Sequence, residues 1–209
     1  MDVAIPIFDG LTALDAIGPY EVLSRLPDAR VRFLAAEPGA KRTENGMLAL
    51  IADRALDDLR QPDVVVVPGG FGTRALLGEE RILAWLREAH AHSTWTTSVC
   101  TGSLLLAAAG ILEGLEATTH WLAMDELAEQ GVTPVSRRIV EQGKVLTAAG
   151  VSAGIDMALL LASRIAGEEL ARGIQLGIEY DPDPPFPGGS LETSPPEIVE
   201  LVRRNVELA

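Results

Sequence analysis

The chain has 209 residues, a formal net charge of −13 at pH 7 and a hydrophobic content of 47%. This length suffices to bury one sizeable core, so we expect a single domain over residues 1–209. The acidic balance argues against a nucleic-acid partner, because phosphate binding needs clustered Lys and Arg. Neither a run of about 18 apolar residues nor an N-terminal signal is evident. We therefore expect no membrane partner and a cytoplasmic location.

Cysteine and histidine are scarce, which limits the sites that this chain can build. The lone cysteine, Cys100, excludes an intramolecular disulfide and a metal site made of several thiolates. The three histidines lack the spacing of metal ligands, so we expect no metal, and the chemistry considered below needs no cofactor. Cys100 is then either an inert buried residue or a reactive thiol.

Short strand-like runs alternate with helical segments along the sequence. Apolar and β-branched runs predict strands at residues 3–8, 31–34, 63–67 and 94–99 and a hairpin over residues 138–147. Helices are predicted at residues 20–26, 79–91, 101–109, 120–130 and 152–166. The prolines of residues 181–189 predict an extended surface connection. This alternation indicates an α/β three-layer sandwich, with helices on both faces of a mostly parallel sheet.

Cys100 lies where one of these strands ends and a helix begins. A lone cysteine is more often a small buried hydrophobe than a nucleophile. Its place at a sharp strand-to-helix turn favours the nucleophile, because such a turn lifts the side chain clear of the sheet. The first amides of the following helix should also lower the pKa of the thiol.

Two further loops should reach the same edge of the sheet as Cys100. Gly69 and Gly70 follow a buried strand, and glycines let backbone N–H groups approach a developing anion, although a plain turn explains them as well. Asp15 is predicted in the loop before the helix at residues 20–26. A solvated loop residue is the ordinary expectation for an Asp. Its apolar neighbours instead suggest a carboxyl group with a raised pKa that could hold a proton for donation.

His120 opens the predicted helix at residues 120–130, and its role is open on the sequence alone. It could orient or protonate a group near Cys100, or it could simply pack against Trp121. Nothing in the spacing identifies its partner.

Three segments together resemble the ThiJ/PfpI superfamily, namely residues 68–70, 98–103 and 117–121. Within it, the segments at 14–19, 149–156 and 179–186 are similar to isonitrile hydratases. The resemblance extends over essentially the whole chain. It implies a flavodoxin-like fold, a single domain of the class I glutamine amidotransferase-like type, and a homodimer.

The resemblance also implies roles for individual residues. It makes Cys100 the nucleophile, Asp15 the acid that hydrogen-bonds the sulfur, and Thr101 a neighbour that assists at the pocket. The substrate, a small molecule, would be bound by Gly69, Gly70, His120 and Val151. Many other members of the superfamily place a Glu where this chain has Asp15, and the shorter side chain favours the hydratase.

The expected activity is hydration of an isonitrile to an N-substituted formamide through a Cys100 thioimidate, without a cofactor. Two alternatives remain open on the sequence. One is a glyoxalase-like or deglycase-like enzyme acting on small carbonyl compounds. The other is a module that senses a ligand or oxidation without turnover, as in the amidase-like domains of AraC-type regulators.

Overall fold

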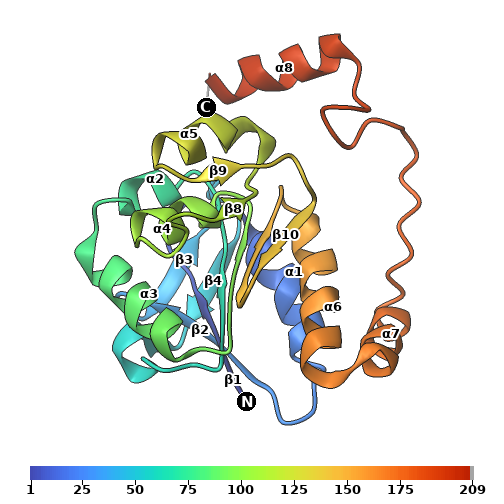
Figure 1. The fold of residues 1–209 in the computed structure, drawn as a ribbon. Coiled ribbons are helices and arrows are strands. Elements are labelled where there is room, and N and C mark those ends of the chain that lie inside the picture. Colours follow the sequence, from blue (N-terminus) through green and yellow to red (C-terminus); the bar gives the residue numbers. More distant parts are fainter. Residues whose placement is uncertain (208–209) are drawn as a thin grey trace.

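A seven-stranded sheet forms the centre of the computed structural model, which describes residues 1–207 (Figure 1). Its order is β10-β11-β7-β6-β1-β2-β5, and every neighbouring pair is parallel except β10 with β11. The strands are β1 (Asp2–Pro6), β2 (Arg30–Ala35), β5 (Arg54–Ala55), β6 (Val64–Val67), β7 (Trp95–Val99), β10 (Ile139–Gln142) and β11 (Val145–Ala148). The predicted mostly parallel sheet is confirmed.

Helices cover both faces of this sheet, as the sequence predicted (Figure 1). On one face lie α1 (Ala13–Leu23) and α6 (Ala153–Ala166), with α7 (Glu168–Gly177) packed on α6. On the other lie α3 (Glu80–His92) and α4 (Gly102–Ala108), with α2 (Thr73–Leu76) and α5 (Met124–Glu129) against α4. The result is the flavodoxin-like three-layer sandwich.

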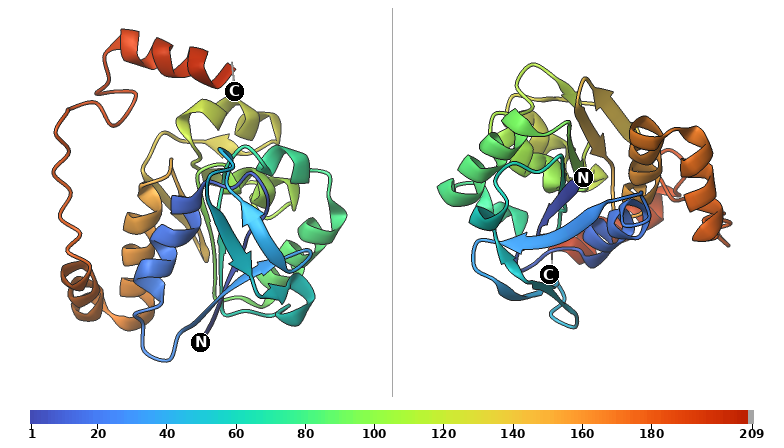
Figure 2. Two further views of the ribbon diagram at one scale, coloured as in Figure 1. Left: turned by 180° about the vertical axis from the view of Figure 1, so that it is seen from behind. Right: turned by 90° about the horizontal axis from the view of Figure 1, so that it is seen from below.

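Two small sheets and two 3₁₀ turns complete the body. β3 (Gly39–Arg42) and β4 (Ala49–Ala52) form an antiparallel hairpin beside the main sheet, seen at the front of the left view in Figure 2. β8 (Glu116–Ala117) and β9 (Thr133–Pro134) pair in parallel. The 3₁₀ turns are η1 (Leu56–Asp58) and η2 (Trp121–Ala123). Among the described residues, no helix combines the length and apolar character needed to cross a membrane.

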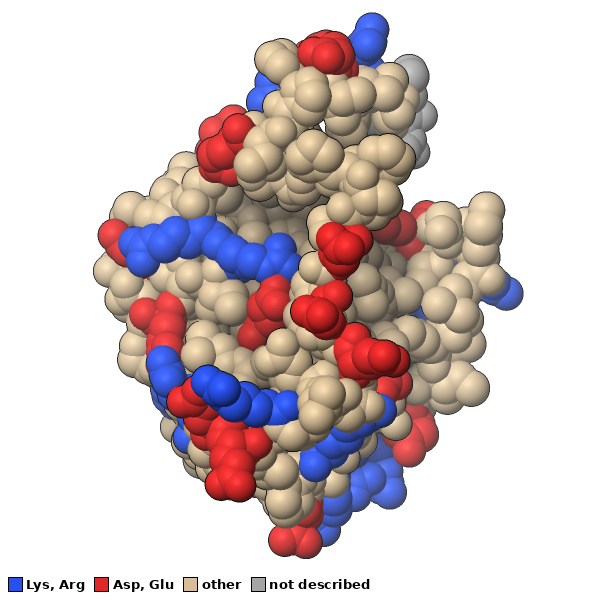
Figure 3. All heavy atoms as spheres, turned by 90° about the vertical axis from the view of Figure 1, so that its right-hand side faces the viewer, with Lys and Arg blue, Asp and Glu red and all other residues tan. Residues whose placement is uncertain are grey.

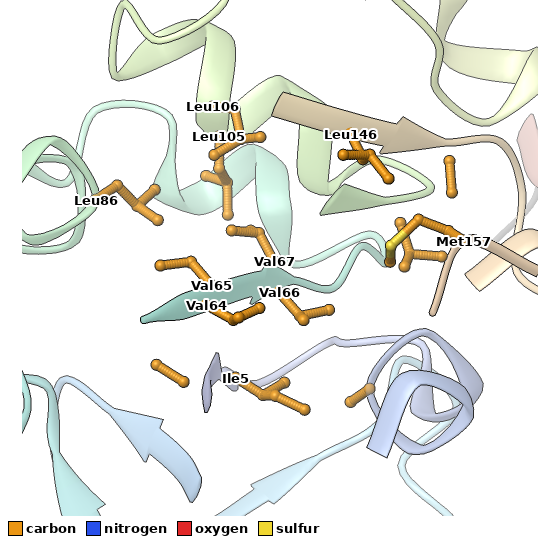
Figure 4. Close-up of a cluster of buried hydrophobic side chains, with 14 of the residues drawn as sticks. Ile5, Val64, Val65, Val66, Val67, Leu86, Leu105, Leu106, Leu146 and Met157 are labelled. Carbon is orange, nitrogen blue, oxygen red and sulfur yellow. The ribbon is translucent and has the colours of Figure 1, made fainter. Parts of the chain in front are cut away.

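The hydrophobic core surrounds β6, whose four valines are almost completely buried (Figure 4). A strand covered by helices on both faces needs apolar side chains in both directions, which explains the uninterrupted Val64–Val67 run. Leu105 and Leu86 pack from one helical layer and Met157 from the other. This core fixes the positions at which the strands end.

The order of the strands decides where a ligand site can form. From β1 the chain proceeds to β2 on one side, and later to β6 on the other. In open α/β sheets, ligands bind outside the carboxyl ends of the strands at such a reversal. The segments that follow β1, β6, β7 and β11 therefore meet at one edge of the sheet.

The predicted start of the first helix was wrong. Instead of beginning after Gly18, α1 begins at Ala13 and continues through Pro19 to Leu23, so that Asp15 lies in its first turn and not in a loop. Pro19 removes a single helical hydrogen bond, the one to the Asp15 carbonyl group. Gly18 lies close against Ile155 of α6, so α1 packs tightly on α6. This packing offsets the hydrogen bond that is lost at Pro19.

Other predicted elements hold with small changes. The helix predicted at residues 120–130 is divided into η2 and α5, and residues 181–189 contain neither helix nor strand, as expected. The β3–β4 hairpin, α7 and α8 (Pro196–Glu207) were not predicted. The helix α8 stands apart from the sandwich at the end of an extended arm (Figure 1).

Candidate active site

Cys100 occupies a strained and tightly held turn between β7 and α4. Its φ of 57° is rare for a residue with a side chain, and such strain persists where the surroundings enforce it. The Cys100 N–H donates to the carbonyl oxygens of Ala148 (3.1 Å) and Ala149 (3.0 Å). Its own carbonyl oxygen accepts a hydrogen bond from the Thr119 hydroxyl at 3.0 Å. The side chain is 5% exposed, so the sulfur lies at the floor of the site.

The charge state of this sulfur differs from the sequence prediction. Burial raises the pKa of the Cys100 thiol, and the carboxylate of Asp15 raises it further. The backbone N–H groups of Thr101 and Val151 hydrogen-bond the sulfur and lower its pKa, but by less. The backbone amides therefore lower the pKa of Cys100 as predicted, but burial raises it by more. The loss of solvation destabilises the thiolate more than two amide hydrogen bonds stabilise it.

Asp15 is fully buried beside this sulfur. Its Oδ2 accepts a hydrogen bond from the Gly69 N–H at 3.0 Å, and its Oδ1 has no partner among the described residues. Burial raises the pKa of Asp15 from 3.8 to about 7, against hydrogen bonds from Gly69 and the Cys100 thiol that lower it, while Glu44 adds to the rise. The sequence prediction of a raised pKa is confirmed.

The two glycines after β6 support the site in a different way from the one predicted. The Gly69 N–H is engaged by Asp15, and the Gly70 N–H donates to the Thr101 hydroxyl at 2.9 Å. That hydroxyl in turn donates to the Gly70 carbonyl oxygen at 3.1 Å. The glycine amides are thus not free donors for an anion. The backbone N–H groups of Thr101 and Val151, which lower the pKa of the Cys100 thiol, are the candidate donors in their place.

His120 lies on the wall of the pocket and also packs against its neighbour. Its Nδ1 accepts a hydrogen bond from the Leu122 N–H at 3.3 Å, and its ring lies 5.8 Å from the Trp121 ring. Burial and the nearby Arg74 lower the pKa of His120 and so favour the neutral ring. With Nδ1 as an acceptor, the neutral ring carries its proton on Nε2. The ring also lies close against Gly150.

A pocket of about 580 Å³ opens above Cys100, in the hollow below α8 (Figure 3). It is lined by Thr12, Glu44, Gly70, Phe71, Arg74, Cys100, Thr101, His120, Trp121, Leu122, Ala123, Asp125, Glu126, Val151, Val202 and Arg203. Of the predicted site residues, Cys100, Thr101, Gly70, His120 and Val151 line it directly. Asp15 and Gly69 lie behind it, in contact with one another.

Several of these lining residues could not be predicted from the sequence. Glu44 reaches the pocket from the β3–β4 hairpin, where the Thr12 hydroxyl donates to its carboxylate at 3.1 Å. The Asn45-Gly46 pair after Glu44 is a turn signal that could have predicted the hairpin. Nothing in the sequence indicates that this hairpin lies beside the carboxyl end of β1. Among the described residues, no group of His, Cys, Asp and Glu side chains could hold a metal ion.

Comparisons with known proteins identify a family and several relatives of this chain. The sequence profile of the DJ-1/PfpI family matches residues 1–164. The chain is 40% identical to the isonitrile hydratase of Pseudomonas putida over 204 residues, which cover 98% of this chain and 89% of that protein. It is 33% identical to the HTH-type transcriptional regulator CdhR of Pseudomonas aeruginosa, over 80% of this chain and 50% of the regulator. The crystal structure of a ThiJ/PfpI family protein from Pseudomonas syringae is 34% identical, covers 99% of this chain and 86% of that chain, and superposes with a TM-score of 0.94.

Proposed function

Because this chain belongs to the DJ-1/PfpI family, we propose that it is an isonitrile hydratase that uses Cys100 as its nucleophile and Asp15 as its proton carrier. The observation that carries the proposal is the pairing of a buried Cys100 at the floor of the pocket with a buried Asp15 behind it, near enough for each to shift the pKa of the other. The identity of 40% to an isonitrile hydratase over nearly the whole chain supports the substrate class.

The first half of the reaction needs a nucleophile and an acid in the same small space. Asp15, with a pKa of about 7, takes the proton from the Cys100 thiol, and the thiolate attacks the terminal carbon of the isonitrile. Asp15 then returns that proton to the same carbon. One S–C bond and one C–H bond form, and the product is a neutral thioimidate on Cys100.

The second half adds water to the thioimidate carbon. Asp15 accepts a proton from this water as the hydroxyl group bonds to the carbon, and passes that proton to the imine nitrogen. The tetrahedral adduct collapses with cleavage of the S–C bond, and its hydroxyl proton passes through Asp15 to the sulfur, which releases an N-substituted formamide and restores the thiol. The N–H groups of Thr101 and Val151 stabilise the departing sulfur.

A carbonyl-directed activity would need another base, and His120 was the candidate for it. Its Nδ1 is engaged with the Leu122 N–H, which leaves an Nε2–H that can only donate a hydrogen bond. A hydrogen-bond donor suits the binding of a substrate better than the removal of a proton from one. This supports the hydratase over the glyoxalase-like alternative.

Turnover of cyclohexyl isocyanide to its formamide tests the proposal. We expect wild type to form the formamide and to leave methylglyoxal unchanged, and Cys100→Ala to form none. Ser98→Ala is a matched control, because it removes another buried heteroatom from β7, a hydroxyl that has no hydrogen-bond partner among the described residues. Formamide production by Cys100→Ala near the wild-type rate would overturn the assignment of the nucleophile.

A further inference from the structure

The pocket above Cys100 is not closed by the sandwich alone. Val202 and Arg203 of α8 line it from the side opposite the sheet. The Arg203 guanidinium lies 5.8 Å from the centre of the Trp121 ring, in a cation–π contact. The arm that carries α8 contacts the body through a hydrogen bond from the Ser136 hydroxyl to the Glu192 carboxylate, at 3.0 Å. Figure 1 shows α8 above α5, whose residues Asp125 and Glu126 also line the pocket.

This outer part of the pocket differs chemically from its floor. The floor holds the sulfur, two amides and a buried carboxyl group, which suit the isonitrile carbon. Trp121, Val202, Arg203 and Phe71 line the pocket away from its floor, together with the acidic Asp125 and Glu126 of α5. The Arg74 guanidinium is already occupied there, since it lies over Phe71 at 5.6 Å and pairs with Glu126 at 2.6 Å.

We propose that α8 is the specificity element of this enzyme, and that Trp121, Val202 and Arg203 bind the hydrocarbon group on the isonitrile nitrogen. The inference rests on the proposed function and deepens it. An isonitrile is linear at its reacting end, so its nitrogen substituent points away from Cys100 and towards the mouth of the pocket. Apolar and aromatic surface at that mouth stabilises a bulky hydrocarbon substituent more than a methyl group.

The packing of α8 fits a wall that opens to admit substrate. Its apolar residues Ile198, Leu201 and Val202 remain 46%, 47% and 37% exposed, so little hydrophobic burial holds the helix in place. A hydrocarbon substituent between α8 and Trp121 would bury part of this surface. Binding of the substrate would then stabilise the position of α8 over the pocket.

The comparisons point to the same segment. The family profile ends at residue 164, before α7, the arm and α8. The matches to the isonitrile hydratase and to the Pseudomonas syringae protein nevertheless cover 98% and 99% of this chain. The segment that carries α8 is therefore shared with these two relatives although it lies outside the family profile, as expected of an element that serves specificity and not the fold.

A double variant, Val202→Ala with Arg203→Ala, tests the inference with two substrates. We expect the ratio of kcat/KM for cyclohexyl isocyanide to that for methyl isocyanide to fall about tenfold, mainly through KM for the cyclohexyl compound. Arg204→Ala is the control, because it removes an equal charge from α8 at a residue that does not line the pocket. An unchanged ratio in the double variant, or an equal fall in Arg204→Ala, would overturn the inference.

A second measurement does not depend on turnover. The double variant should raise the alkylation rate of Cys100 by the bulky N-phenylmaleimide severalfold relative to that by iodoacetamide, because the mouth of the pocket is wider. Equal effects on both reagents would count against α8 as a wall. If wild type does not hydrate isonitriles but the double variant shows this selective labelling, the proposed function is wrong, and so is the assignment of a hydrocarbon substituent to α8. The assignment of α8 as a wall of the pocket would still hold.

Discussion

Asp15 and Cys100 titrate as one coupled pair, because each influences the pKa of the other. Attack on the isonitrile needs the pair to hold one proton, shared between sulfur and carboxylate. Burial raises both pKa values, so the first of two protons leaves at a pH of about 7 and the second far above it. We therefore expect kcat/KM to rise with pH through about 7 and then to stay constant. A fall above this pH would identify the doubly protonated pair as the active form.

Replacement of Asp15 by Asn keeps the shape of the side chain but removes its ability to carry a proton. The amide oxygen can still accept the hydrogen bond from the Gly69 N–H, but the side chain can neither take the thiol proton nor return it. We expect kcat/KM to fall by about 10²-fold or more and the rise near neutral pH to disappear. Asp15→Glu should lie between Asn and wild type, because its carboxyl group is displaced. Undiminished hydration by Asp15→Asn would place the proton carrier elsewhere, and a pH profile of kcat/KM for the three proteins decides this.

At Cys100 the sequence predicted the local turn but not the direction of the pKa shift, whereas at Asp15 it predicted the raised pKa. The position of Cys100 between a β-branched strand and a Leu- and Ala-rich helix was enough to identify the turn. The direction of its pKa was not predictable, because it depends on how deeply the tertiary structure buries the sulfur. The engagement of both glycine amides by Asp15 and Thr101 also arises from contacts between segments far apart in the sequence.

The loop after β6 must pass very close to the Thr101 backbone and the Asp15 side chain. A Cβ atom on Gly69 would lie 2.5 Å from the Thr101 nitrogen and 3.0 Å from Asp15 Oδ2. We expect Gly69→Ala to lower kcat/KM at least about tenfold and to destabilise the fold by roughly 1–3 kcal/mol. Gly78→Ala is the matched control, because a Cβ there meets no atom within 4 Å. Measured kcat/KM and urea midpoints that are equal for the two variants would contradict this account of the loop.

The helices and strands with a clear local pattern of apolar residues were predicted, and those that depend on tertiary contacts were not. The uninterrupted apolar run of β6 and the helix α6 needed only local patterns. The start of α1 was missed because Gly18-Pro19 reads as a helix start, whereas packing on α6 carries the helix through both residues. The predicted extended connection before α8 was correct, but the return of α8 to the pocket has no local signature.

For the whole molecule, the buried Asp15 links stability to pH. Its pKa is higher in the folded chain, so its contribution is most favourable below about pH 4 and is lost as the pH rises to about 7. The loss amounts to roughly 4 kcal/mol when complete. Asp15→Asn should therefore gain stability over wild type as the pH rises through this window and keep the gain above it. Urea unfolding at about pH 5 and about pH 8 checks this, and an equal difference at both would contradict it.

We propose that two copies of the chain associate. Large apolar side chains are exposed on the β3–β4 hairpin, at Met47, Leu48 and Ile51, and on α7 at Leu176. Large exposed apolar side chains of this kind are more frequent at interfaces than on free surface. Light scattering should give about twice the chain mass of 22.2 kDa. A single species at the mass of one chain, at micromolar concentration, would exclude the dimer.

The most direct test of the central claim is the mass of the intact protein during a single turnover. Wild type mixed with cyclohexyl isocyanide and quenched in acid within milliseconds should carry one added isonitrile, located by peptide mapping on the segment that contains Cys100. This species should disappear as the formamide forms, and Cys100→Ser should carry none. Formation of the formamide at the full rate without any covalent species on Cys100 would contradict the thioimidate and the function built on it.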